Sequence, residues 1–171
     1  MTLLLLHFAA TLFMTGLVWF VQAVHYPLLH RVGGAAFTRY ETGHSRRTSP
    51  VVAPVMFFEL GSGAWLALVP PALADPLLML VNAALLLVVW GSTIALQKPL
   101  HRNLVQGFSA DSVDRLVSTN WIRTVAWSLR ALLLLFVLQT LLLAPPQTVA
   151  TPVATPGDTP ALPPIQGVLL K

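Results

Sequence analysis

Four stretches of almost unbroken apolar residues divide the chain, and most of the polar residues lie between them. The stretches cover roughly 3–23, 51–69, 77–96 and 121–143. Each is close to the about 20 residues that a helix needs to cross the apolar core of a bilayer. In the third stretch, LLMLVNAALLLVVWGSTIAL, no helical face would carry a charge, whereas the helices of a water-soluble bundle have charged outer faces. The pattern therefore predicts four membrane-spanning helices rather than a soluble bundle.

The segments between these stretches set the expected topology. They are a tight turn at 70–76 and two longer polar segments at 24–50 and 97–120. Because short connections make consecutive helices antiparallel neighbours, we expect an all-α, integral membrane, antiparallel four-helix bundle over 1–143. The remaining residues, 144–171, are rich in Thr-Pro and Ala-Pro steps and predict a disordered tail.

Both polar segments contain short helical signals of their own. The stretch GGAAFTRYETGHSRRTS predicts a short surface helix, and Pro27 is expected to help end the first span. In FSADSVDRLV, either Ser109 or Asp111 is suited to cap a second surface helix. We expect both helices to lie at the same membrane surface.

Composition and charge agree with a membrane protein. Hydrophobic residues make up 56% of the 171 residues and charged residues only 9%, against roughly 25% charged residues in soluble proteins. The net charge of +4 arises in the polar segments, where basic residues serve topology, so we expect no nucleic-acid partner. The chain has no cysteine, which excludes a disulfide framework and a thiolate metal site.

The basic residues also predict an orientation. Excess Lys and Arg in short loops marks the cytoplasmic side, and the turn on the opposite side contains only the acidic Asp75. We therefore expect a multi-pass protein of the bacterial inner membrane with both termini outside the cytoplasm. A cleaved signal peptide is the alternative for the first stretch, but it lacks a basic start and exceeds the usual apolar length of about 7–15 residues. The basic residues of the two polar segments are Arg31, Arg39, Arg46, Arg47, Lys98, Arg102 and Arg115.

Two ionisable residues, Glu59 and Arg130, interrupt the apolar stretches. Counted from the cytoplasmic ends of their spans, they lie about 12 and about 13.5 Å deep, at roughly 1.5 Å per residue. Charges inside a bilayer usually face the bundle and have a partner, so we predict a Glu59–Arg130 ion pair near mid-membrane. The pair has two interpretations, a structural link between two helices or part of a functional pocket.

The first and last spans each carry a polar face. Arg123, Trp127 and Arg130 share one face of the last span because steps of four and three residues stay together on a helix. Arg123 either reaches a ligand or extends toward lipid headgroups. In the first span, His7 and Gln22 lie on the face that ends at His25. His7 is about 27 Å from His25, so we expect it to be a satisfied core or interfacial histidine.

Histidines gather at the predicted cytoplasmic end. His25, His30, His44 and His101 all lie there, with Glu59 below them. A metal or haem site is one interpretation, but no spacing is diagnostic, so no metal ligand is assigned and the cofactor stays unknown. The other interpretation is a histidine that acts as an acid, a base or a hydrogen-bond donor.

Several phrases resemble known families when read together: W19-F-V-Q-A-V-H25-Y-P, F37-T-R-Y-E-T-G-H44-S-R-R, P54-V-M-F-F-E59 and N120-W-I-R123-T-V-A-W. They resemble small four-helix bacterial membrane proteins. The last phrase is also distantly similar to the anthrone-oxygenase-like family, much of which has no known function. That resemblance implies a paired role for Asn120 and Arg123 at the start of the last span, and it does not extend to a substrate.

Two classes of function remain open. The first is an intramembrane enzyme that acts on a small lipophilic substrate through a polar pocket at the cytoplasmic side. The second is a non-enzymatic assembly or interaction subunit, or a small transport component, which would need to form a homo-oligomer because a single bundle without repeats is a poor transporter. For the enzyme, the candidate catalytic residues are His25, His44, Glu59, Arg123 and Arg130, and the candidate substrate-binding residues are Gln22, Asn120 and Trp127.

Overall fold

The computed structural model describes residues 1–144, and this part of the chain is all-helical, without a strand. Four helical segments are long and apolar enough to cross a membrane: Thr2–Arg31, Gly34–Leu68, Pro76–Gln106 and Ala110–Leu143. The prediction of an all-α protein with four long helices is therefore confirmed. The predicted tail, 144–171, lies outside the described residues apart from Ala144.

The segments subdivide as follows. The first contains α1 (Thr2–Phe20), the π-helical η1 (Val21–His25), α2 (Tyr26–Leu28) and the 3₁₀-helical η2 (Leu29–Arg31). The second is a single helix, α3 (Gly34–Leu68). The third contains α4 (Pro76–Ser92), the π-helical η3 (Thr93–Gln97) and α5 (Lys98–Gln106), and the fourth is α6 (Ala110–Leu143).

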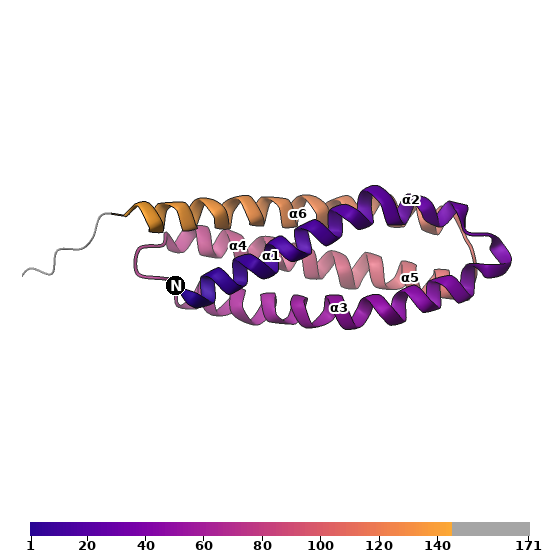
Figure 1. Ribbon diagram of the computed structural model, residues 1–171, viewed down its shortest axis with the longest axis horizontal. Helices are drawn as coiled ribbons and strands as arrows, with labels where there is room; N and C mark the ends of the chain where they lie inside the picture. Colours follow the sequence, from indigo (N-terminus) through magenta and orange to yellow (C-terminus); the bar gives the residue numbers. More distant parts are fainter. Residues whose placement is uncertain (145–171) are drawn as a thin grey trace, which may run out of the picture.

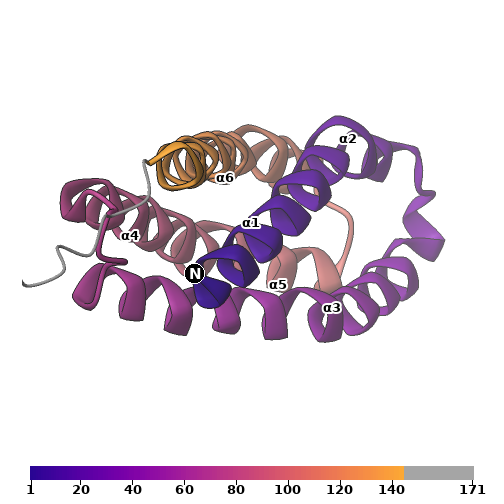
Figure 2. The same ribbon diagram turned by 60° about the vertical axis from the view of Figure 1, so that its left-hand side comes forward.

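The long helices lie side by side along one axis (Figure 1). The N-terminus, the connection between α3 and α4, and the end of α6 lie at one end of the bundle, while α2 and α5 lie toward the other. Helix α1 crosses diagonally from α3 toward α6, on the side of the bundle away from α4 and α5 (Figures 1 and 2). Helices α1 and α4 each pack against both α3 and α6, so the four helices close a ring.

Two prolines widen the helices at corresponding places. Pro27 and Pro99 each follow a π-helical segment by two positions, after Val21–His25 and Thr93–Gln97. A proline inside a helix has no N–H to donate and crowds the carbonyl four residues earlier, so a wider local turn relieves the crowding. The expectation that Pro27 ends the first helix is wrong, because the chain stays helical to Arg31.

Helix α3 joins the predicted short surface helix and the second span into one element. It runs from Gly34 to Leu68 through Pro50 and Pro54. Packing explains this continuity, since α3 buries Phe37 on one side of the prolines and Met56 on the other. The second predicted surface helix is likewise not a separate element but forms the first turns of α6, whose start is capped by Ser109 Oγ, which accepts a hydrogen bond from the Ser112 backbone N–H at 3.2 Å.

Apolar and polar layers alternate along the bundle. The apolar layer nearest the N-terminus includes Leu4, Leu66, Met79 and Leu134. The middle layer includes Met14, Val18, Met56 and Trp127. The layer near α2 and α5 includes Tyr26, Phe37, Leu104 and Leu116. Buried polar residues separate these layers. The sequence produces this order because each long helix places a polar group on its inner face between two apolar turns.

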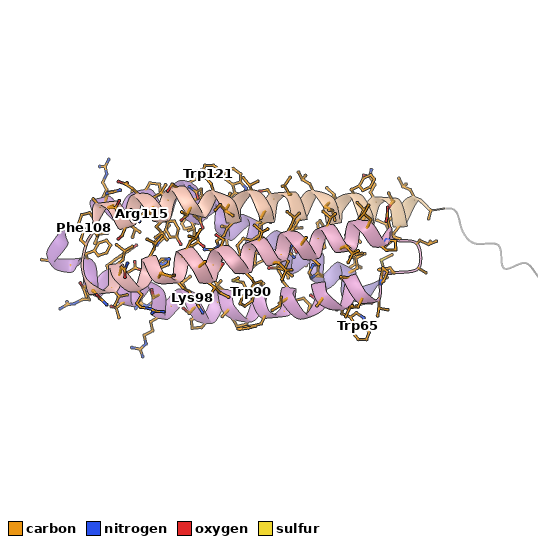
Figure 3. All side chains as sticks on the ribbon, turned by 180° about the vertical axis from the view of Figure 1, so that it is seen from behind. Trp65, Trp90, Lys98, Phe108, Arg115 and Trp121 are labelled. Atoms are coloured by element: carbon orange, nitrogen blue, oxygen red, sulfur yellow. The ribbon has the colours of Figure 1, made fainter. Side chains whose placement is uncertain are left out.

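The outer surface of the bundle is apolar over its middle. Phe57, Leu87 and Leu132 are 62%, 65% and 64% exposed, and many other large apolar side chains also face outward. Water-soluble proteins seldom expose apolar patches of this extent. The exposed Arg115 lies away from this apolar middle. Figure 3 shows it on the first turns of α6, near the end of the bundle opposite Trp65.

Candidate functional site

The deepest polar feature is the ion pair between Glu59 and Arg130. Arg130 Nη1 donates to Glu59 Oε1 at 2.8 Å, and both side chains are 0% exposed. Glu59 lies on α3 and Arg130 on α6, so the pair links two helices across the bundle. The pairing predicted from equal depth in the two spans is confirmed.

Glu59 also accepts hydrogen bonds from two further side chains. Thr11 Oγ1 on α1 donates to Glu59 Oε1 at 2.8 Å, and Trp127 Nε1 on α6 donates to Glu59 Oε2 at 3.1 Å. Both carboxylate oxygens therefore have donors. Full satisfaction of a buried charge is the condition under which such a group is tolerated away from water.

Arg130 is satisfied in the same way, and its contacts define the state of His7. Arg130 Nε donates to Asn82 Oδ1 at 3.1 Å, while Arg130 Nη2 and Asn82 Nδ2 both lie 3.2 Å from His7 Nε2. Since both neighbours are donors, His7 Nε2 is the acceptor. The opposite nitrogen, Nδ1, then carries the proton and donates to Ser62 Oγ at 2.7 Å. His7 is thus a core histidine whose ring nitrogens are both hydrogen-bonded. This is one of the two interpretations predicted for it.

A second polar link lies closer to α2 and α5. Asn120 Nδ2 donates to Gln22 Oε1 at 2.9 Å, and Gln22 Nε2 donates to the Val117 carbonyl at 3.1 Å. Gln22 and Asn120 were predicted to bind substrate. The structure places them against each other, both buried, where they join α6 to the π-helical turn of the first segment.

The third polar feature is a cluster of imidazoles around Glu41. The His44 ring stacks on His25 at 4.2 Å and on His101 at 5.9 Å between centroids. His101 Nδ1 donates to Glu41 Oε1, and its Nε2 lies 3.0 Å from the Tyr26 hydroxyl. Figure 3 shows the neighbouring Lys98 on the same side of the bundle as Trp90.

Burial and neighbouring charges set the protonation of this cluster, which lies outside the predicted spans. Burial, together with the adjacent His25, lowers the pKa of His44 to about 4. Burial alone would raise the pKa of Glu41, but the hydrogen bond from His101 and the nearby imidazoles lower it below its ordinary value. At neutral pH the cluster therefore combines an uncharged His44 with a carboxylate at Glu41.

We expect this cluster to make the protein less stable in acid. The pKa of His44 is 6.5 in the unfolded chain and about 4 in the fold, so between these values the unfolded state binds more protons and the free energy of unfolding falls with the pH. The lowered pKa of Glu41 acts in the same direction at lower pH. Thermal unfolding from pH 7.5 to 5 should show this slope. The slope should become shallower in H44Q, where His25, whose pKa burial also lowers, still contributes, and it should persist in H30Q, whose histidine is exposed.

A cavity of about 360 Å³ lies beside the cluster, between all four long segments. Its body is apolar, with walls that include Met14, Val18, Met56 and Trp90, and its polar end includes Tyr26, His44, His101 and Arg123. Figure 3 shows Trp90 between the ribbons of α4 and α3. The volume is at the small end of the range of about 300–1,000 Å³ that is typical of ligand pockets.

Arg123 lines the cavity rather than extending toward the surface. Its guanidinium lies 5.3 Å from the centre of the buried Trp127 ring and beside the Tyr26 hydroxyl. Its Nε is buried and has no hydrogen-bond partner. Of the two roles predicted for Arg123, the one directed at an internal site therefore agrees with its position.

The predicted site residues thus fall into separate groups. His44 and Arg123 line the cavity, and His25 stacks on His44 without being among the lining residues. Glu59, Trp127 and Arg130 belong to the deep network, one apolar layer away. No single pocket joins all the candidates.

Sequence reasoning missed several members of these groups. Asn82 was not among the candidate site residues, yet it forms hydrogen bonds with both His7 and Arg130. Glu41 and Tyr26 were not singled out, although Glu41 is 0% exposed. A signal was present for Glu41, because it precedes His44 by three residues and so shares its helical face.

The cluster is not arranged as a metal centre. Among residues 1–144, no group of three or more His, Cys, Asp or Glu side chains is placed to hold a metal ion. The imidazoles stack face to face, so their ring nitrogens do not converge on one point. The metal or haem interpretation of these histidines therefore finds no ligand set in the described part of the chain.

These observations define a class: an all-helical protein with four helices suited to crossing a membrane, a buried Glu59–Arg130 hydrogen-bond network and an amphipathic cavity. Comparison of the chain with protein-family models, with curated proteins and with solved structures found no match.

Proposed function

We propose that this is an integral membrane protein whose cavity holds a small lipophilic substrate near the cytoplasmic side. The apolar outer surface and the four long apolar helices support insertion in a bilayer. The basic residues between the spans support an orientation with that end in the cytoplasm and both termini outside.

The observation that carries the proposal is the division of the cavity into an apolar body and a polar end. Met14, Met56 and Trp90 offer contact area to an apolar molecule, whereas His44 and Arg123 offer hydrogen bonds to a polar head. Small-molecule sites characteristically combine a mostly apolar lining with a few placed polar groups. Phe57 and Ile94, which are 62% and 55% exposed, also line the cavity and place apolar side chains at its opening, beside the exposed lining residues Ser49 and Lys98.

The polar end has the groups needed for proton-transfer chemistry. His44 is the candidate acid or base, because it lines the cavity and His25 does not. Arg123 is placed to stabilise an oxyanion on the substrate. Glu41 orients His101 through its hydrogen bond, which leaves the opposite ring nitrogen for Tyr26. Under this proposal Glu59 and Arg130 support the site from below and do not contact the substrate.

A non-enzymatic membrane subunit is the second candidate. The observation that favours it is the deep network, whose charged groups satisfy one another and lie outside the cavity lining. A saturated network of this kind specifies how helices pack and needs no substrate. The two candidates differ in whether the cavity binds a small molecule.

Photolabelling with benzophenone tests the cavity directly, with the protein in phosphatidylcholine nanodiscs. Benzophenone is apolar, carries a carbonyl acceptor and reacts preferentially with methionine on illumination. We expect saturable labelling of Met14 and Met56, which are only 1% and 4% exposed. The variant A53F, which fills the cavity, should lose at least tenfold of this labelling.

The matched control is A84F, which adds the same ring to an exposed position of α4. It should label like the unaltered protein. Labelling that spreads without saturation over outward-facing residues, and that A53F leaves unchanged, would contradict a ligand-binding cavity and favour the non-enzymatic subunit.

A further inference from the structure

We propose that the cavity is selective for a lipophilic anion, a single-chain molecule whose oxyanion head pairs with Arg123. This inference rests on the proposed function, since it names the class of molecule that the cavity holds. It depends on the charge that the protein leaves uncompensated at the polar end.

Arg123 forms no salt bridge within the described part of the chain. The five carboxylates among residues 1–144 all have other partners. Glu59 binds Arg130, Glu41 binds His101, Asp111 binds Arg115, Asp114 binds His30, and Asp75 caps α4 by accepting from the Leu77 N–H. Residues 1–144 therefore supply no counter-ion to Arg123.

The position of Arg123 makes this lack of a counter-ion consequential. A guanidinium that fully reaches water or lipid headgroups needs no protein partner, but Arg123 is only partly exposed, it stacks on the buried Trp127, and its Nε is buried without a hydrogen-bond partner. An unpaired charge in such surroundings is costly, and an anion entering the cavity would remove that cost. The contrast with Arg130, which is fully paired one layer deeper, separates a structural arginine from one that is available to a ligand.

The rest of the cavity lining also favours a negatively charged ligand. Its charged lining residues are Lys98 and Arg123, and no carboxylate lines it. Trp90 Nε1, on the cavity wall, is a buried donor without a partner. The cavity therefore offers donors and positive charge to a ligand, which suits an acceptor-only head such as a carboxylate or phenolate.

The apolar body sets the form of the tail. A volume of about 360 Å³ suits one chain or a small ring system rather than the two chains of a phospholipid. The exposed lining residues Phe57 and Ile94 offer the tail an apolar route from the lipid while the head reaches Arg123. Size, entrance and charge thus define one class, a single-chain amphiphilic anion.

Competition against benzophenone photolabelling tests the class of ligand. The competitors are decanoate, decanol and decyltrimethylammonium, compared at equal concentration in phosphatidylcholine nanodiscs at pH 7.5. We expect decanoate to protect Met56 at a concentration at least tenfold lower than decanol, and decyltrimethylammonium to protect least. Equal protection by decanoate and decanol, with labelling intact, would overturn the anion assignment and leave the proposed function standing. Absence of saturable labelling would refute the proposed function itself.

Variants assign the preference to Arg123. R123Q should bring decanoate to the level of decanol, whereas R123K should keep a preference of at least threefold. R46Q removes an exposed cation from α3 outside the cavity lining and should leave the preference unchanged. A preference that survives in a folded R123Q protein contradicts the assignment. In a further arm, phosphatidylglycerol replaces phosphatidylcholine; if this alone protects Met56 as well as decanoate does, the anion is a lipid headgroup and the single-chain assignment is wrong.

Discussion

Replacing Arg130 by methionine is expected to lower the free energy of unfolding by about 3–5 kcal/mol. The loss follows from the charge left behind, because Glu59 would remain 0% exposed with no cation beside it. Asn82 and His7 would each lose a hydrogen-bond partner as well. Reversible unfolding in mixed micelles, followed by circular dichroism, measures the change.

The matched control is R115M on the same helix. Arg115 pairs with Asp111, but the two side chains are 68% and 73% exposed, so water replaces the lost contact and the change should be within about 1 kcal/mol. The double variant E59M/R130M should be more stable than R130M, since it removes both charges. A loss in R130M no larger than in R115M would contradict the central role of the pair.

Replacing Gly63 by alanine is expected to lower the free energy of unfolding by about 1–3 kcal/mol relative to the same change at Gly61. A Cβ at Gly63 would lie 2.9 Å from Leu86 Cδ2 and 3.1 Å from His7 Cε1. The leucine tip can rotate away. The His7 ring is held by three hydrogen bonds and cannot move without weakening the network.

Gly61 provides the matched control two residues earlier on α3. Nothing lies within 4 Å of a Cβ built there, so G61A should be neutral or stabilising by up to about 1 kcal/mol through helix propensity. The difference between G63A and G61A in one unfolding assay isolates the close approach of His7. If the two variants unfold alike, the tight packing around His7 is not a determinant of stability.

The positions of Glu59 and Arg130 were predictable because depth in a bilayer follows from residue counting. The hydrogen-bond partners of these two side chains were not predictable from the sequence. Thr11 and Asn82 are ordinary polar residues within apolar stretches, and only the rotation and stagger of four helices bring them to the same level. Periodicity in the sequence shows on which face of its helix a residue lies. It does not show which residues of the neighbouring helices lie at the same level along the bundle axis.

The cavity illustrates the same limit more strongly. His44 and Arg123 were identified as candidates from the sequence. That they line one cavity together with Tyr26 and Met56 depends on how the widened turns before Pro27 and Pro99 displace the helices that follow. A proline marks where a helix is perturbed without saying whether it ends or widens. His25 illustrates the consequence, because it lies next to the cavity end and yet does not line it.

The sequence alone determined the number of long helices, the apolar outer surface and the presence of charges at one depth, since these follow from hydrophobicity and helical periodicity. Only the tertiary structure decided which charges are satisfied. Glu59 and Arg130 neutralise each other within the core, whereas Arg123 is held beside a cavity with no carboxylate of residues 1–144 paired to it. The physical reason is that electrostatic energy depends on distances between side chains from different helices, and those distances exist only once the helices have packed.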